Sequence, residues 1–189
     1  MARSRSGASG DPFAEILAAT HTHRARHGCG AYPYSEGPLL GVIAAAASAR
    51  RIVELGTALG YTSLWLAHGA ESAHVDTVER DPEHVRLARG HFAAAGYGGR
   101  ITVHEGDFET VLPHLAPPYD LAFFDGFAPS LVYHAEFRRL LRPRGVLVST
   151  NLDVGRGDAY RAALADPAQW LTSFAAEDGR TAISVKLGL

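Results

Sequence analysis

The chain has one cysteine, little net charge and no long apolar run among its 189 residues. The lone Cys29 cannot form a disulfide within the chain, and one cysteine predicts no zinc motif, so a reducing compartment is favoured. No apolar run reaches the roughly 18 residues of a membrane span. The net charge of −2 indicates no basic surface for nucleic acid or anionic lipid. These absences predict a cytoplasmic protein with no nucleic-acid and no membrane partner.

The N-terminus also lacks features, because no apolar segment follows Arg3 and Arg5. Residues 1–10 are therefore a poor signal peptide, and we expect a disordered tail. The rest of the chain, with 47% hydrophobic residues overall, can form one domain with a full core. We expect N-terminal helices and a lid over 11–50, followed by a catalytic core over 51–189.

From Arg51 onward, short β-type runs alternate with helical patterns. The runs do not alternate polar with apolar residues, which is typical of strands buried on both faces of a parallel sheet. The last two runs, 170–177 and 181–187, flank Asp178-Gly179 and predict a hairpin. The sequence therefore predicts an α/β, Rossmann-like, doubly wound sheet with helices on both faces. It is mostly parallel, has seven strands and closes with an antiparallel C-terminal hairpin.

Several helices can be placed from their boundaries. After the second strand, Asp81 can cap a helix and Gly96 can end it, with an apolar face between them. Helical patterns also cover 13–27 and 35–49, and the glycine- and aromatic-rich segment 28–34 between them predicts a lid or entrance. The apolar face expected on the capped helix consists of Val85, Ala88, Phe92 and Ala95.

The loop after the first strand reads G-T-A-L-G-Y-T, with Gly56 and Gly60 between strand and helix. Glycine allows a sharp turn and the close approach of a ligand, and the helix N-terminus points into the same space. The middle glycine of the dinucleotide fingerprint G-x-G-x-x-G is absent. This favours a ligand without a diphosphate, although a nucleotide-dependent oxidoreductase is an alternative.

Acidic residues end four successive predicted strands. Glu79 follows Gly56 by 23 residues, about where a ribose-binding acid is expected. Such acids converge on the crevice where open α/β sheets bind ligands. They suit S-adenosylmethionine, because its ribose, adenine amine and sulfonium favour acceptors or negative charge. The four acids are Glu54, Glu79, Asp107 and Asp125.

The stretches VELGTALGYTSLWLA, VERDP, HEGDFETVLPHL, YDLAFFDG and LLRPRGVLVSTN occur in family order. From about Glu36 to the C-terminus, the chain resembles class I S-adenosylmethionine-dependent methyltransferases. More narrowly, it is similar to the small O-methyltransferase family that includes catechol and caffeoyl-CoA O-methyltransferases. The resemblance implies methyl transfer to a small-molecule acceptor, in most cases a hydroxyl, and a homodimer. It implies cofactor contacts from Glu36, Glu54, Gly56, Thr57, Gly60, Tyr61, Thr62, Glu79, Arg80, Asp107, Phe108 and Asp125.

The chain departs from the family at the metal site. Metal-dependent members follow the fourth strand with D-A-D-K, whereas this chain has Asp125-Gly126-Phe127-Ala128, and their Asp-Asn pair is replaced by Thr150-Asn151. Losing one carboxylate weakens a site for a hard cation, so a role for Mg²⁺ is doubtful. If a divalent cation binds, the resemblance implies Asp125 and Asn151 as ligands, and Asp153 could replace the lost carboxylate.

Without that metal and lysine, another group must accept the proton of the acceptor. His134, in the helix after the fourth strand, is the first candidate base. Asp125 is a second candidate catalytic residue. The alternative for His134 is an exposed helix histidine without a role. Tyr32, Tyr34 and Asn151 could line the acceptor pocket, with His27 nearby; packing of the N-terminal segment is the alternative for the tyrosines.

Two further functions remain open on the sequence. The loss of the metal-and-lysine set is compatible with a methyltransferase of the same fold that acts on nitrogen or carbon. It is equally compatible with a partner protein that binds the cofactor and has lost catalysis. Mass analysis of the product with candidate acceptors would distinguish methylation on nitrogen or carbon from methylation on oxygen. Failure to turn over any acceptor despite tight cofactor binding would favour the partner protein.

Overall fold

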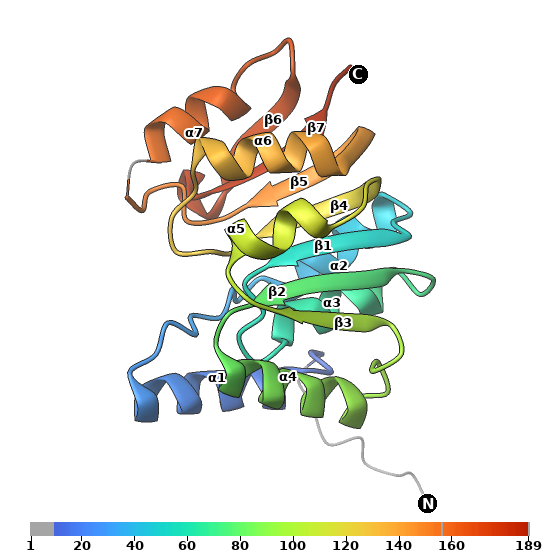
Figure 1. Cartoon of the computed structure of the whole chain (residues 1–189), viewed down its shortest axis with the longest axis vertical. Coiled ribbons are helices and arrows are strands. Elements are labelled where there is room, and N and C mark those ends of the chain that lie inside the picture. Colours follow the sequence, from blue (N-terminus) through green and yellow to red (C-terminus); the bar gives the residue numbers. More distant parts are fainter. Residues whose placement is uncertain (1–9, 156, 189) are drawn as a thin grey trace, which may run out of the picture.

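The structure is a computed structural model that describes residues 10–155 and 157–188 (Figure 1). All of the predicted tail except Gly10 lies outside these residues. Seven strands form one sheet in the order β3-β2-β1-β4-β5-β7-β6. The strands are β1 (Arg51–Leu55), β2 (His74–Glu79), β3 (Ile101–Glu105), β4 (Tyr119–Phe124), β5 (Leu141–Ser149), β6 (Trp170–Ala176) and β7 (Thr181–Lys186).

The sheet is mixed in the predicted way. The pairs formed among β1 to β5 are all parallel, while β7 pairs antiparallel with both β5 and β6. The chain therefore winds outward from β1 through β2 to β3, then crosses to β4 on the other side of β1. The carboxyl ends of β1 and β4 form the switch point at which open α/β sheets bind their ligands. The predicted fold class is confirmed.

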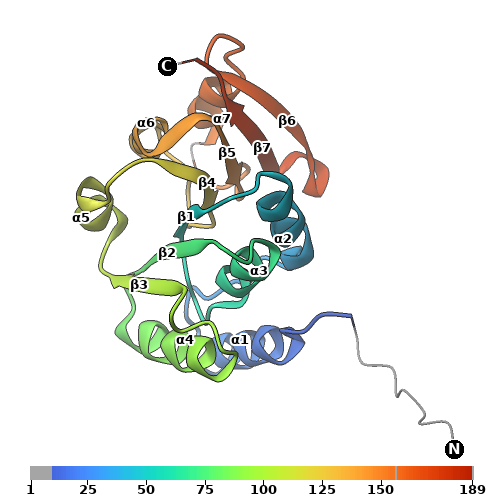
Figure 2. The same ribbon diagram turned by 90° about the vertical axis from the view of Figure 1, so that its right-hand side faces the viewer.

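Helices cover both faces of the sheet, as Figure 2 shows. One face packs on α2, α3 and α4 through a buried cluster that includes Leu40, Leu64 and Phe92, and the other packs on α5, α6 and α7 through a cluster that includes Phe137 and Tyr160. α1 lies beside α4 (Figures 1 and 2). The helices are α1 (Ala14–His27), α2 (Gly37–Ala46), α3 (Tyr61–Gly69), α4 (Pro82–Ala94), α5 (Phe108–Val111), α6 (Leu131–Leu140) and α7 (Gly157–Leu164).

Several predicted boundaries shift. The helix expected over 108–115 is α5 followed by a 3-10 turn at Leu112–His114, and the fifth strand starts directly after α6, four residues earlier than expected. The hairpin turn is a 3-10 turn, Glu177–Gly179, with Asp178 in a left-handed conformation at φ 55°. None of the helices within the described ranges combines the length and the hydropathy that a membrane crossing requires.

The predicted start of α4 is confirmed. Asp81 Oδ1 accepts hydrogen bonds from the backbone N–H of Glu83 at 2.9 Å and of His84 at 3.3 Å, which caps the helix. Three of the four residues of its expected apolar face are buried, whereas Ala95, which caps the C-terminus of the helix, is exposed.

Candidate active site

The loop between β1 and α3 lies at the switch point, and its glycines serve packing within the protein. Gly56 has φ +100°, and a Cβ added there would lie 2.8 Å from the carbonyl oxygen of Asp125. Gly60 has φ +95°, and its added Cβ would lie 2.3 Å from the ring of Phe92. Both therefore need a left-handed backbone and the absence of a side chain. The space beside the two Cα atoms is filled by the protein itself, and the close approach of a ligand to the backbone of this loop stays a prediction.

Glu54 is fully buried at the end of β1 and does not face the crevice. Its Oε1 accepts a hydrogen bond from Thr62 Oγ1 at 2.5 Å, and its Oε2 accepts one from Thr77 Oγ1 at 2.7 Å and another from Ser63 Oγ. Burial raises the pKa of Glu54 to about 7, against the lowering effect of these hydroxyls. The side chain therefore joins β1, β2 and the first turn of α3, and a cofactor contact from Glu54 stays a prediction for its backbone.

Other side chains of the loop also turn inward. Thr57 Oγ1 lies 2.6 Å from Thr77 Oγ1, and both side chains are buried. Tyr61 donates its hydroxyl hydrogen to Asp11 Oδ2 at 2.7 Å. Cofactor contacts from Thr57, Tyr61 and Thr62 stay predictions, and these side chains already have partners within the protein. What the loop offers to a ligand is the backbone N–H groups of the first turn of α3, which have no partner within the helix.

Glu79 holds its predicted place at the end of β2. Its Oε2 accepts a hydrogen bond from Ala58 N–H at 2.9 Å and its Oε1 accepts one from Asp81 N–H at 3.0 Å. Burial alone would raise its pKa, but the imidazole of His84 and the two N–H groups outweigh that effect and lower it. Glu79 is therefore a fixed, ionised acceptor beside the β1–α3 loop.

The remaining predicted cofactor residues lie along the same rim. Arg80 and Asp107 follow β2 and β3, are both well exposed, and their Nη1 and Oδ1 atoms are 4.0 Å apart. Phe108 is half-buried, with its ring edge-on to Phe124. Glu36 is exposed immediately before α2. These positions are compatible with a ligand laid across the strand ends.

Asp125 follows β4 and has one engaged and one open oxygen. Its Oδ1 accepts hydrogen bonds from Thr150 Oγ1 at 2.7 Å and from Asn151 Nδ2 at 3.2 Å, whereas Oδ2 has no hydrogen bond from any residue in the described ranges. Burial raises the pKa of Asp125 to about 6, and the negative charge of Glu177 adds to the effect. The site therefore contains a carboxylate with raised proton affinity.

The residues around Asp125 do not fit a magnesium site. Asn151 directs its amide nitrogen, a donor, at both Asp125 Oδ1 and the carbonyl oxygen of Gly126, at 3.2 Å and 2.8 Å. A hard cation needs several oxygen ligands. Within residues 10–155 and 157–188, no group of three or more acidic, histidine or cysteine ligands includes Asp125, and Asp153 is exposed to solvent. The Asp125–Asn151 pair is a hydrogen bond between side chains.

His134 is not available as a base. It is buried between α6 and α7, and its Nε2 accepts a hydrogen bond from Trp170 Nε1 at 2.9 Å. Because indole N–H can only donate, the imidazole proton is on Nδ1 and its one lone pair is engaged. Burial also lowers the pKa of His134. Both predictions for this residue, a base in the crevice and an exposed histidine, were wrong: it belongs to the core.

The segment 28–34 brings one predicted pocket residue to the site. Tyr34 is 5% exposed, its ring lies 5.5 Å from that of Phe123, and burial together with nearby Glu177, Glu36 and Asp125 raises its pKa to about 12. Tyr32 is 65% exposed and lies under the guanidinium of Arg24 instead, while His27 is exposed on α1. Sequence reasoning missed Thr77, Ser63 and Glu177, whose roles depend on contacts between distant segments.

The crevice is an open rim, and two hollows of the described surface lie elsewhere. One, of about 390 Å³, is lined by Phe92 and Val103, and the other, of about 670 Å³, lies between α1 and α4 and is lined by Phe13 and His91. Neither includes a carboxylate from a strand end. The chemistry of Glu79 and Asp125 therefore identifies the candidate site better than surface shape does.

Comparisons with known proteins identify the family to which the chain is similar. A family described as a methyltransferase domain matches residues 53–151, just over half of the chain. A "Putative O-methyltransferase" of Mycobacterium sp. (strain KMS) is 35% identical over 92% of this chain and 82% of its own length. A "Catechol O-methyltransferase" of Mycobacterium tuberculosis is 37% identical over 65% of this chain, which spans 57% of that relative. The O-methyltransferase TomG from Streptomyces achromogenes, solved in complex with SAM, shares the fold at a TM-score of 0.76 and 24% identity, over 92% of this chain and 90% of that chain.

Proposed function

Because the chain belongs to the S-adenosylmethionine-dependent O-methyltransferase family, we propose that it transfers a methyl group from S-adenosylmethionine to a hydroxyl of a small molecule. The observation that carries this proposal is the pair of strand-end carboxylates on either side of β1. Glu79 is fixed and ionised at the end of β2, and Asp125 has an open oxygen at the end of β4. The described residues fit the cofactor at this edge of the sheet.

We assign Glu79 to the ribose hydroxyls. Its two backbone donors fix the carboxylate, and its remaining lone pairs can accept from two hydroxyl groups. The backbone N–H groups at the start of α3 suit a carboxylate at the methionine end. When bound, the cofactor supplies an electrophilic methyl group on a positively charged sulfur. Arg80, Asp107, Phe108 and Glu36 remain predicted contacts along the rim.

We assign the proton-accepting role to Asp125. Thr150 and Asn151 hold Oδ1 and fix the carboxylate, which leaves Oδ2 to accept a proton. A carboxylate whose pKa is about 6 is ionised at neutral pH and is still a stronger base than an ordinary aspartate. The proton of the acceptor hydroxyl would pass to Oδ2 as the new oxygen–carbon bond forms. No metal is needed for this step.

We propose an aromatic hydroxyl as the acceptor. The name of the mycobacterial relative indicates a catechol substrate for that protein, and aromatic side chains border Asp125 here. Tyr34 is buried beside β4, and Phe127, two residues after Asp125, is 87% exposed. Tyr32 and Asn151 remain predicted pocket residues, and the homodimer and the cytoplasmic location remain predictions.

Cofactor binding and turnover test the proposal separately. We expect calorimetry to detect binding of S-adenosylhomocysteine to the wild-type chain, and mass spectrometry to detect methylated catechol in the presence of a chelator. Glu79→Gln should weaken binding by roughly 10- to 100-fold, because a hydrogen bond to a charged group contributes about 1.5–3 kcal/mol. The exposed Glu105→Gln is the matched control. Unchanged affinity in Glu79→Gln would contradict the ribose assignment, and methylation on nitrogen or carbon would contradict the acceptor class.

A further inference from the structure

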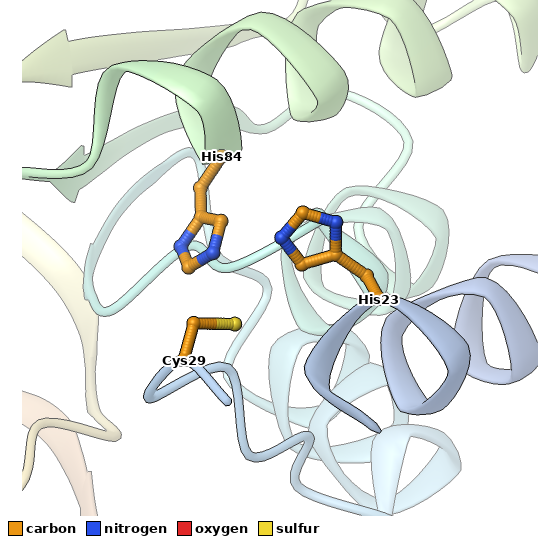
Figure 3. Close-up of side chains that lie close together, drawn as sticks. All are labelled: His23, Cys29 and His84. Atoms are coloured by element: carbon orange, nitrogen blue, oxygen red, sulfur yellow. The ribbon is translucent and has the colours of Figure 1, made fainter. Parts of the chain in front are cut away.

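Three potential metal ligands meet outside the candidate active site. His23 comes from α1, Cys29 from the segment after α1, and His84 from the first turn of α4 (Figure 3). One ligand atom from each residue lies within 4.8 Å of the other two. Figure 3 shows the three side chains pointing toward one another. The site therefore joins segments separated by more than fifty residues.

The state of His84 gives an independent indication of a ligand. This side chain is 5% exposed, and its Nε2 has no hydrogen-bond partner among residues 10–155 and 157–188. A buried polar atom without a partner costs free energy, so such atoms in folded proteins call for an explanation. On the other side of the ring, Nδ1 lies 3.8 Å from Glu79 Oε1. A carboxylate behind an imidazole is the usual arrangement around a histidine that binds a metal.

The donor set selects the metal. A cysteine sulfur with two imidazole nitrogens suits Zn²⁺, which prefers nitrogen and sulfur ligands in tetrahedral geometry, and does not suit Mg²⁺. Zinc–ligand bonds of about 2.0–2.3 Å place tetrahedral ligand atoms roughly 3.5 Å apart, so the three groups need to close by about 1 Å. Asp81 Oδ2 lies 4.0 Å from His84 Nε2 and offers a fourth ligand.

We propose that His23, Cys29 and His84 bind a zinc ion, with Asp81 or a water molecule in the fourth position. The ion ties α1 and the segment 28–34 to the start of α4. It therefore holds in place the segment that carries Tyr34, and through His84 it lies next to Glu79. Methyl transfer does not require this ion, so the proposal goes beyond the proposed function.

The single cysteine makes a clean experiment possible. The metal-free chain is titrated with Zn²⁺ against a chromophoric chelator, and then with Co²⁺, without any cofactor present. We expect one tightly bound Zn²⁺ per chain and, with Co²⁺, both the visible bands of a tetrahedral site and a thiolate-to-cobalt charge-transfer band. Because Cys29 is the sole cysteine, that last band identifies it as a ligand. Bound Zn²⁺ should also slow alkylation of the Cys29 thiol.

Variants separate this site from adventitious binding. Cys29→Ser should abolish the charge-transfer band and weaken Zn²⁺ binding by at least 100-fold, and His84→Asn should weaken binding similarly. His21→Ala removes an exposed histidine of α1, the helix that carries His23, and should leave Zn²⁺ binding unchanged. Cys29 is only half-buried, so its serine variant should fold, which circular dichroism checks. Equal Zn²⁺ affinity in the wild type and Cys29→Ser, or alkylation unaffected by Zn²⁺, would show only a thiol–imidazole contact and overturn the proposal.

Discussion

At the scale of single residues, Glu54 and Asp125 show how burial gives two carboxyl groups different uses. Burial raises the pKa of both. Glu54 is enclosed by three hydroxyl donors and is completely buried, so its carboxyl group can only hold neighbouring elements of the protein together. Asp125 is held by donors on one oxygen only, which leaves the other oxygen for chemistry. The number of engaged oxygens, rather than the pKa, distinguishes the structural group from the reactive one.

Glu54 predicts a pH dependence of stability. Its pKa is 4.5 when unfolded and about 7 when folded, so between these values the folded chain binds more protons. The stabilising contribution is complete below about pH 4.5 and is lost as the pH rises through about 7. Glu54→Gln removes this loss. The free energy of unfolding of Glu54→Gln, taken relative to that of the wild type, should therefore be larger at about pH 8 than at about pH 5, by up to about 3 kcal/mol.

Urea unfolding at the two pH values measures this difference. Glu71→Gln, at an exposed position, is the control and should give the same difference from wild type at both. If the difference between Glu54→Gln and wild type does not change with pH, then Glu54 does not titrate in this range in the folded chain.

Asp125 predicts a pH dependence of catalysis. The proton acceptor must be ionised, so kcat/KM should rise with pH through about 6 and then level off. Asp125→Asn removes the base and should lower kcat by about 10²–10⁴-fold, while the affinity for S-adenosylhomocysteine changes only a few-fold. Steady-state rates across the pH range, together with calorimetry, measure both. A variant that keeps the rate, or the rise near pH 6, would show that another group takes the proton.

At the scale of elements, two glycines, one before a helix and one within a helix, have opposite requirements. Gly60 precedes α3 with φ +95° and lies against Phe92, whereas Gly90 lies within α4, is exposed and has no atom within 4 Å of an added Cβ. Gly60→Ala should destabilise the chain by roughly 2–4 kcal/mol through backbone strain and overpacking. Gly90→Ala should stabilise it by about 0.5–1 kcal/mol, because alanine has the higher helix propensity.

Chemical denaturation of the two variants beside wild type tests this contrast. A stabilising Gly60→Ala would mean that the loop can adopt another conformation at no cost. A destabilising Gly90→Ala would mean that α4 has a close neighbour at this position.

The elements were predictable where a single segment determines them. Asp81 caps α4 and Gly96 follows its end because both features are local, and the buried strands were evident from their apolar runs. The orientation of side chains was not predictable when it depends on distant residues. The side chain of Glu54 is held by Thr77, 23 residues later, and nothing in the local sequence indicates that contact. His134 looked accessible until Trp170 was found to donate to it.

The same limit explains the zinc proposal. The single cysteine predicted no zinc motif, because the zinc motifs that can be recognised in a sequence have closely spaced ligands. His23, Cys29 and His84 come together only because α1 lies beside α4 in the folded chain. Ligand sets built from separate elements have no spacing rule in the sequence.

At the scale of the whole molecule, the strand order separates the switch point, where we expect the ligand to bind, from the edge strand β6. The order β3-β2-β1-β4-β5-β7-β6 places Glu79 on one side of β1 and Asp125 on the other, while β6 is an edge strand beyond β5 and β7. The segment 28–34 spans the switch point, because it leads from α1, which lies beside α4, to Tyr34, which packs against Phe123 of β4. Ligand binding at the switch point should therefore stabilise the segments around Glu79 and Tyr34 and leave β6 unaffected.

Hydrogen exchange with and without S-adenosylhomocysteine tests this division. A ligand that binds only the folded state lowers the population of locally opened forms at the segments it contacts. We expect slower exchange at 56–60, 79–81 and 28–34, and unchanged exchange in β6, whose ladder contacts only β7. Glu79→Gln at the same ligand concentration should show less protection in all three segments. Protection that includes β6 equally would show that the ligand stabilises the domain as one cooperative unit, and protection confined to β6 and β7 would place the binding site at the wrong end of the sheet.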